Sequence, residues 1–245
     1  MPALEHAPSS LSRMRYYWRV MHYALGPYPS LFFLLHRLRE PENAHHQVRA
    51  GVDLVIESFP RSGSTFAEIA FKLAQPNLVH TADHLHVPAQ IVRAARLGIP
   101  TCVLTRHPAD AVRSLVVKYP DIRVRDAVRG YAMFYSRCLR WRRHFVVAEF
   151  EEVTADFGHV VERINKRFGT DFASFSHTAK NVAKVNSLLD ERNLIFNNGA
   201  ILASYRPNGA KAMAKQDIDL SGHARLLDRS LALYDRYRFL AQEAE

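Results

Sequence analysis

The amino-acid sequence predicts an α/β fold, a three-layer sandwich around a mostly parallel central sheet. Short β-branched apolar runs alternate along the chain with segments whose apolar residues recur at helical spacing. The 245 residues are 48% hydrophobic and 23% charged, which is ordinary for a globular protein and excludes collagen, coiled coil and wholesale disorder. No internal repeat or Ser/Gly linker interrupts the alternation.

The individual elements follow from these runs. Four apolar runs predict buried strands at residues 52–56, from residue 78, at 101–105 and at 145–148. Helical spacing predicts helices at residues 66–73, 89–97, 108–117, 124–142, 154–169 and 224–240, with Gly98 and Gly169 as stop signals. Strands that alternate with helices pair in parallel, so functional side chains are expected beyond the carboxyl ends of the strands.

An aromatic and basic segment, residues 13–39, precedes the first expected strand. It predicts two short helices, broken at Gly26-Pro27, that pack on the core. The aromatic and arginine side chains are also compatible with a peripheral membrane contact. A lid or a dimer contact is a third interpretation.

Charge and cysteine content limit the classes of partner and compartment. The chain has 33 Lys and Arg against 24 Asp and Glu, a net charge of +9, which favours a phosphorylated cofactor, nucleic acid or an anionic membrane surface. The two cysteines, Cys102 and Cys138, are too few for a disulfide scaffold and have no metal-ligand spacing. The first twelve residues lack the apolar core of a signal peptide, so a cytoplasmic location is expected.

The loop after the first strand, residues 59–66, has the features of an anion site. Gly63 allows the backbone to approach a ligand, and the loop amides lead into a helix N-terminus. Arg61 can fork onto phosphate or sulfate oxygens, and hydroxyl donors follow at Ser62, Ser64 and Thr65. The alternative is a Ser-rich turn that only caps the helix. A nucleoside-triphosphatase loop is disfavoured, because no Gly-Lys-Ser/Thr is present.

Residues 59–66 resemble the 5′-phosphosulfate loop of sulfotransferases that use 3′-phosphoadenosine 5′-phosphosulfate (PAPS). In that family a basic residue, Ser, Gly, Ser or Thr, Thr and an aromatic residue follow a proline. The resemblance implies a P-loop-like fold of the sulfotransferase and nucleotide-kinase type. It also implies that Arg61 and the amides of the loop hold the 5′-phosphosulfate, and that Phe66 lies near the adenine.

A second half-site follows the third expected strand. Arg106 ends that strand, and Ser114 comes eight residues later in the next helix, behind Pro108 at a first-turn position. This pattern resembles the family's 3′-phosphate motif, and a helix N-terminus beside an arginine suits a dianion. The alternative is an arginine that caps a strand and an unrelated serine on a helix face.

The stretch 80–88 contains the candidate general base. His86-Val87-Pro88 resembles the family's His-Leu-Pro, which makes His86 the expected base, since histidine suits proton transfer near neutral pH. His84 stands where the family has lysine and is the second candidate, or contacts the transferring sulfuryl group. Asp83 is a third candidate base. The His-x-His pair is also a candidate metal pair, although no third ligand is apparent in the sequence.

Weaker resemblances cover the rest of the chain. Residues 150–153 resemble a structural Tyr-Glu-Asp-Leu segment of the family. Residues 205–211 resemble the Arg-Lys-Gly segment that closes over the 3′-phosphate, although Pro207 replaces its lysine and Gly209 comes one residue late. Arg206 is therefore a candidate phosphate ligand, with a solvated loop arginine as the alternative.

The resemblance implies one domain, residues 1–245. Its parts are a helical N-terminal extension (1–50), a cofactor-binding core (52–170) and a helical C-terminal part (171–245) with a candidate lid at 204–217. It implies in-line transfer of a sulfuryl group from PAPS to a hydroxyl or amine, with release of adenosine 3′,5′-bisphosphate and no metal. The acceptor is an unidentified small molecule or carbohydrate, with glycolipid among the candidates, and the oligomeric state is open.

Two other functions remain as alternatives. The first is a P-loop-type nucleotide or small-molecule kinase, against which the missing lysine and metal carboxylate count. The second is a basic nucleic-acid-binding protein, whose footprint would be a helix face formed by Arg137, Arg140, Arg142 and Arg143 with Tyr135 and Trp141. A solvated basic face explains these residues equally well, and no nucleic-acid partner is expected.

Overall fold

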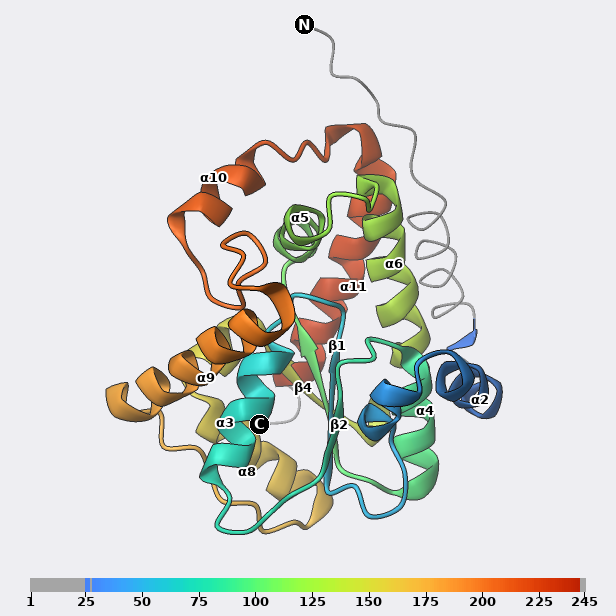
Figure 1. Ribbon diagram of the computed structural model, residues 1–245. Helices are drawn as coiled ribbons and strands as arrows, with labels where there is room; N and C mark the ends of the chain where they lie inside the picture. Colours follow the sequence, from blue (N-terminus) through green and yellow to red (C-terminus); the bar gives the residue numbers. More distant parts are fainter. Residues whose placement is uncertain (1–24, 27, 243–245) are drawn as a thin grey trace, which may run out of the picture.

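A computed structural model describes residues 25, 26 and 28–242 and has the expected α/β architecture (Figure 1). Its described strands form a parallel sheet in the order β2-β1-β3-β4, with bounds Thr81–Asp83, Leu54–Ser58, Thr101–Thr105 and Val146–Glu149. The chain leaves β1 towards β2 and then crosses to β3 on the other side. The carboxyl end of β1 is therefore a topological switch point, where such sheets bind ligands.

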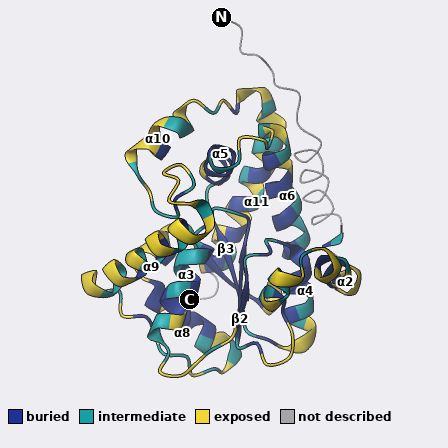
Figure 2. Ribbon diagram, viewed as in Figure 1, coloured by how far each residue is buried: buried dark blue, intermediate teal, exposed yellow. Residues whose placement is uncertain are grey.

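Helices cover both faces of the sheet, which gives the three predicted layers (Figure 2). Val103 and Val147 point to one face, and the neighbouring Leu104 and Ala148 point to the other, as the period of two in a strand requires. The first face is covered by α4 (Pro88–Leu97), α5 (Pro108–Lys118), α6 (Val124–Cys138) and α11 (Ala224–Gln242). The second face is covered by α3 (Ser64–Ala74), α8 (Phe157–Phe168) and α9 (Ala179–Asn197).

The N-terminal extension packs beside the β2 edge. Helix α2 (Pro29–Arg39) inserts Phe32 and Phe33 into a cluster with Val55 and Ala82, and a 3₁₀ helix, η1 (Pro41–His46), follows it. The other predicted helix, within residues 13–26, and the break at Pro27 lie almost wholly outside the described residues. In the part of the chain that the structure describes, no helix combines the length and apolarity that a membrane crossing needs.

Several predicted boundaries are wrong for identifiable reasons. Leu78 is 86% exposed, and β2 begins only at Thr81. The helix predicted at 124–142 ends at Cys138 and continues as a 3₁₀ helix, Leu139–His144. The helix predicted at 154–169 is divided by Asp156 into α7 (Phe150–Ala155) and α8, because the Asp156 carboxylate accepts hydrogen bonds from the first amides of α8. Gly169 ends α8 as predicted.

Candidate functional site

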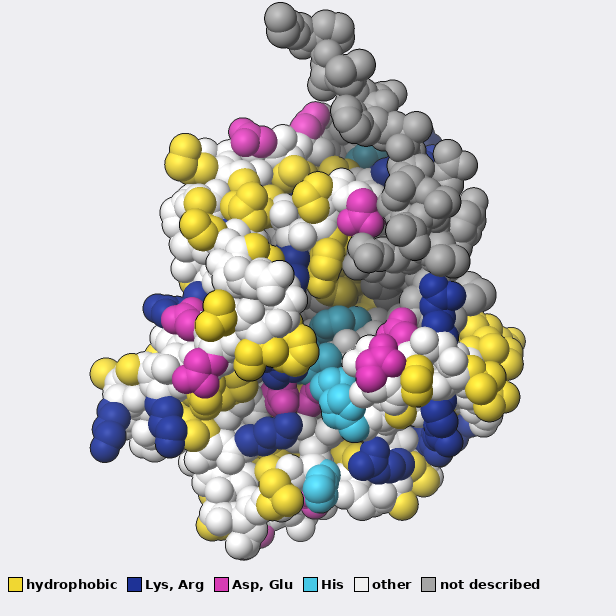
Figure 3. Space-filling view, viewed as in Figure 1, with side chains coloured by type: hydrophobic (Ala, Val, Ile, Leu, Met, Phe, Trp, Pro, Cys, Tyr) yellow, Lys and Arg dark blue, Asp and Glu magenta, His cyan; other side chains and the backbone are white. Residues whose placement is uncertain are grey.

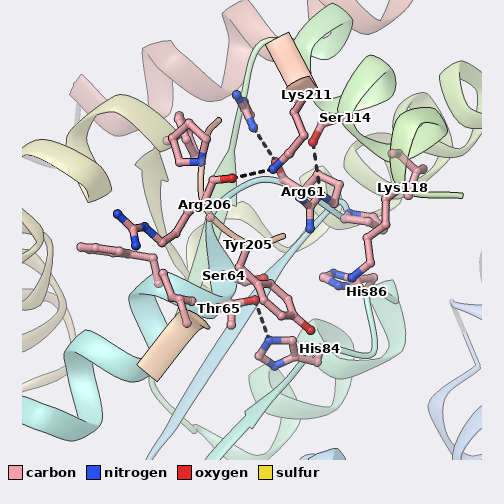
Figure 4. A pocket seen from close by; sticks show the side chains of 18 of the residues that line it. Arg61, Ser64, Thr65, His84, His86, Ser114, Lys118, Tyr205, Arg206 and Lys211 are labelled. Carbon is pink, nitrogen blue, oxygen red and sulfur yellow. Dashed lines mark hydrogen bonds between the residues drawn. The ribbon is translucent and has the colours of Figure 1, made fainter. Parts of the chain in front are cut away.

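A cavity of about 980 Å³ lies beyond the carboxyl ends of β1, β2 and β3. Its walls come from the loop after β1, the first turn of α3, the second half of α5, and the segment from α9 to α10 (Gly209–Gln216), as Figure 4 shows. Among its described lining residues, Glu40 is the one carboxylate, whereas the basic residues are Arg39, Arg61, Arg106, Lys118, Arg206, Lys211 and Lys215. Such an excess of positive charge in a concave site selects an anionic ligand.

The loop after β1 has the backbone of an anion-binding turn. Arg61 and Gly63 both have left-handed backbone conformations, with φ of +70° and +93°. Gly63 is the N-cap of α3, and no side chain caps the first amides of that helix, which leaves them to face a ligand. Ser64, Thr65 and Phe66 line the cavity as expected. Ser62 does not, because its side chain is fully buried beneath the loop.

Replacing Gly63 with alanine should lower the free energy of unfolding by about 1–2 kcal/mol, because the left-handed conformation strains an L-residue. The new Cβ would also lie 3.1 Å from Cδ2 of Phe150, so the loop must shift. Gly98 has φ of +66° with no atom within 4 Å of an added Cβ, which makes Gly98→Ala the matched control. Urea unfolding should show strain in both variants, and calorimetry should show weaker nucleotide binding in Gly63→Ala alone. Unchanged nucleotide affinity in Gly63→Ala would contradict the role given to this loop.

The two half-sites predicted from the sequence are joined in the structure. Nε of Arg61 donates to Oγ of Ser114 over 3.1 Å, and Nη1 of Arg106 donates to the carbonyl oxygen of Arg61 over 3.0 Å. Parallel pairing of β1 and β3 sets the two loops side by side. Arg61 and Ser114 lie 53 positions apart in the chain, yet together with Arg106 they form one continuous wall of the cavity, the cationic wall.

Arg106 is held in place but retains hydrogen-bonding capacity. Its guanidinium stacks over the ring of Phe150 at 3.9 Å, and burial lowers its pKa. Its Nε is buried and has no hydrogen-bond partner among the described residues. A buried charged donor without a partner is costly, and Arg106 lines the cavity, so an anion bound there would offset this cost through its attraction to the guanidinium.

Lys211 on α10 is a site residue that the sequence analysis missed. Its side chain is almost fully buried, and Nζ donates to the carbonyl oxygens of Ser204 and Arg206. Burial, together with repulsion from the neighbouring cations, first of all Arg61, lowers the pKa of Lys211 to about 7. Arg206 lines the cavity as expected, but its guanidinium forms an ion pair with Asp190, 2.5 Å away.

The three candidate bases lie at the end of β2. His84 and His86 line the cavity, and both have left-handed backbone conformations, with φ of +60° and +53°. Asp83 is buried below them and accepts a hydrogen bond from Nδ1 of His84 over 2.6 Å. Nδ1 of His86 donates instead to the carbonyl oxygen of Ser58 over 2.9 Å. Strained backbone of this kind is common at functional sites.

The candidate His-x-His metal pair is not the group that the structure brings together. The potential ligand atoms of His46, from η1, Asp83 and His84 all lie within 4.8 Å of one another, and His86 is not part of this group. Nδ1 of His46 and Nδ1 of His84 lie 2.7 Å and 2.6 Å from Oδ1 of Asp83, so both imidazoles are hydrogen-bonded to the same carboxylate oxygen. The three side chains therefore form a hydrogen-bonded triad.

The residues of the candidate nucleic-acid footprint around α6 do not share one helix face. Tyr135 is buried, and its hydroxyl donates to the carbonyl oxygen of Leu104 in the core. The arginines at 140, 142 and 143 are exposed and lie on the 3₁₀ helix after α6. The arginines therefore lie on the surface, whereas Tyr135 is not available to stack on a base.

Of the three comparisons with known proteins, the one with solved structures gives a match. No protein-family model matches the chain, and no curated protein matches its sequence. Among solved structures, mouse sulfotransferase SULT7A1 complexed with PAP is similar, with a TM-score of 0.49 and 15% sequence identity. The superposition covers 80% of this chain and 90% of that one.

Proposed function

We propose that this protein is a PAPS-dependent sulfotransferase. The observation that carries the proposal is the joined cationic wall, in which Arg61 bonds to Ser114 and Arg106 bonds to the backbone of Arg61. These are the residues whose sequence patterns resemble the 5′-phosphosulfate and 3′-phosphate motifs. Two anion sites in one cavity, at the switch point of a parallel sheet, fit a nucleotide with phosphates at both ends of its ribose.

The residues of the cavity suit in-line sulfuryl transfer. The loop amides and Arg61 hold the phosphosulfate end and stabilise the negative charge that grows on the bridging oxygen as the S–O bond breaks. Arg106 and Ser114, which both line the cavity, hold the 3′-phosphate. When bound, PAPS supplies the sulfuryl group. An imidazole at the end of β2, His86 in the sequence-based prediction or His84, takes the proton of the acceptor.

The proposed acceptor is a hydroxyl or amine of a small molecule or carbohydrate. A base beside this cavity can take the proton from either group. Helix α2 exposes Leu31, Leu34 and Leu38 on one side, which is compatible with the peripheral membrane contact proposed for residues 13–39 and with a glycolipid acceptor. A cytoplasmic location remains part of the proposal.

Calorimetric titration with adenosine 3′,5′-bisphosphate tests the proposed function directly. We expect binding that needs no metal and that is at least tenfold tighter than binding of AMP, since AMP lacks the 3′-phosphate and one charged contact is worth about 1.5–3 kcal/mol. Mg·ATP is the second control. Preference for Mg·ATP over the bisphosphate would refute the proposal and favour a small-molecule kinase.

A further inference from the structure

We infer that His84, rather than His86, takes the proton of the acceptor, and that Asp83 and His46 are positioning residues for its ring. The inference rests on the proposed function and assigns its base. His46 lies in the N-terminal extension, in which the sequence showed no functional motif. Its part in the site follows only from the fold.

The ring of His84 is hydrogen-bonded at both nitrogens, and Figure 4 shows the bond to Thr65. Nδ1 lies 2.6 Å from Oδ1 of Asp83, and Nε2 lies 3.1 Å from Oγ1 of Thr65 in the phosphosulfate loop. An ionised carboxylate only accepts hydrogen bonds, so Nδ1 carries the proton and Nε2 presents its lone pair. The basic atom of His84 therefore faces the loop proposed to hold the sulfuryl donor.

The hydrogen bonds around Asp83 favour its ionised form. Its side chain is 1% exposed, and Oδ2 accepts a hydrogen bond from the hydroxyl of Thr81 over 2.7 Å. Burial alone would raise the pKa of Asp83, but hydrogen bonds from His46 and His84 outweigh burial and hold this pKa well below its usual range. A buried anion beside an imidazole stabilises the imidazolium that forms when Nε2 takes a proton.

His46 completes the arrangement from the opposite side. Its Nδ1 lies 2.7 Å from the same Oδ1 of Asp83, and its carbonyl oxygen accepts a hydrogen bond from the Gln90 amide on α4. Oε1 of Gln90 in turn accepts from the amide of Val48, which anchors the end of η1. His46 thus fixes the rotation of the Asp83 carboxylate and, through it, the plane of the His84 ring.

His86 lacks such support for a positive charge. Burial, followed by repulsion from His84 and Lys118, lowers the pKa of His86 to about 3, although its Nδ1 is bonded to the Ser58 carbonyl. Lys118 points towards His86 in Figure 4. The two imidazoles lie 6.2 Å apart, so a proton on one disfavours a proton on the other. Of the two rings, His84 is the one that is hydrogen-bonded to a carboxylate, that of Asp83.

The other carboxylate close to His84, that of Glu68, is already ion-paired with two basic side chains. Oε2 of Glu68, on α3, lies 3.5 Å from Nδ1 of His84. Glu68 forms ion pairs with Lys72 over 2.6 Å and with Arg192 over 2.8 Å. Asp83 is therefore the carboxylate that is hydrogen-bonded to His84 at the shorter distance, 2.6 Å.

With these groups, every bond and proton in the proposed sulfuryl transfer is accounted for. A lone pair of the acceptor oxygen forms the new O–S bond while its proton passes to Nε2 of His84. The bond between sulfur and the bridging oxygen breaks, and the electron pair stays on the 5′-phosphate of adenosine 3′,5′-bisphosphate. The proton on His84 leaves to solvent through the open cavity.

The test compares His84→Ala, His86→Ala, Asp83→Asn and His46→Gln, with His80→Ala as the control because His80 is an exposed histidine just before β2. Transfer from radiolabelled PAPS is measured with 4-nitrophenol, octyl glucoside and water as probe acceptors, and the fastest probe is used for the profile of kcat against pH. Titration with adenosine 3′,5′-bisphosphate shows which variants retain a folded nucleotide site.

We expect His84→Ala to lose about 10²–10⁴-fold in kcat and to regain part of it with added imidazole, as loss of a general base requires. Asp83→Asn and His46→Gln should lower kcat by up to about 10²-fold through misplacement of the ring, with unchanged KM for PAPS. The loss in Asp83→Asn should persist across the pH profile, because a change of pH does not restore the position of the ring. His80→Ala should match the wild type.

A larger loss in His86→Ala than in His84→Ala would overturn the inference, and so would wild-type turnover in Asp83→Asn. In both cases the protein would still bind the bisphosphate and transfer sulfuryl groups, and the proposed function would stand. A wild-type protein that neither binds the bisphosphate nor turns over PAPS would overturn the function and this inference together.

Discussion

Arg106→Ala should weaken binding of adenosine 3′,5′-bisphosphate by about 10- to 150-fold, the equivalent of the 1.5–3 kcal/mol of a hydrogen bond to a charged group. The structure gives the reason. The Arg106 guanidinium is stacked on Phe150 and anchored to the Arg61 carbonyl, while its buried Nε has no partner among the described residues. Such a side chain loses little conformational freedom when a phosphate binds.

Two controls isolate this effect in calorimetric titrations. Arg129→Ala removes an exposed arginine on α6, outside the cavity lining, and should leave the affinity unchanged apart from a small general loss of charge. AMP should bind wild type and Arg106→Ala almost equally, because AMP has no 3′-phosphate. An equal loss for AMP and for the bisphosphate would mean that Arg106 does not contact the 3′-phosphate.

Binding of adenosine 3′,5′-bisphosphate should weaken as the pH rises above 7, by up to tenfold per pH unit. Burial and the adjacent cations, first of all Arg61, lower the pKa of Lys211 to about 7 in the empty cavity. A bound anion stabilises the ammonium and raises this pKa, so binding above pH 7 takes up a proton. Below pH 7 Lys211 is already charged, and this contribution to the affinity is constant.

Calorimetry at pH 7, 8 and 9, in buffers of different ionisation enthalpy, measures the proton uptake. Lys211→Met should bind more weakly at pH 7 and should lose most of the pH dependence. Lys180→Met, which removes an exposed lysine on α9, should behave like the wild type. The same slope against pH in Lys211→Met and in the wild type would show that another group takes up the proton.

The elements predicted well from the sequence are those whose signal is local. The apolar run at 101–105 coincides with β3, and the Arg106–Ser114 spacing places both residues on the cavity. Helices α9 and α10 were not predicted. In α9, exposed Leu194 and Ile195 follow the buried Val185 and Leu189, so apolar residues on both sides conceal the helical period.

The site residues that escaped prediction come from distant segments. Lys211 lies about 150 residues after the phosphosulfate loop, and His46 lies 37 residues before Asp83. The resemblance of residues 205–211 pointed to Arg206 rather than to Lys211, and no motif includes His46, because parallel crossovers and packing, rather than proximity in the chain, bring these residues together. The buried Ser62 illustrates the converse, since a hydroxyl within a motif is not thereby turned towards the ligand.

The anchoring of η1 has a consequence for how this chain can be divided. Because His46 is hydrogen-bonded to Asp83 and Gln90 ties the end of η1 to α4, residues 41–48 are part of the same packed unit as the sheet rather than a detachable appendage. Exchange of this segment between relatives would replace the histidine that contacts Asp83, and we expect it to alter turnover. A chimaeric protein should therefore take η1 and α4 from the same parent. Its junction should lie after α4 and not at the start of β1.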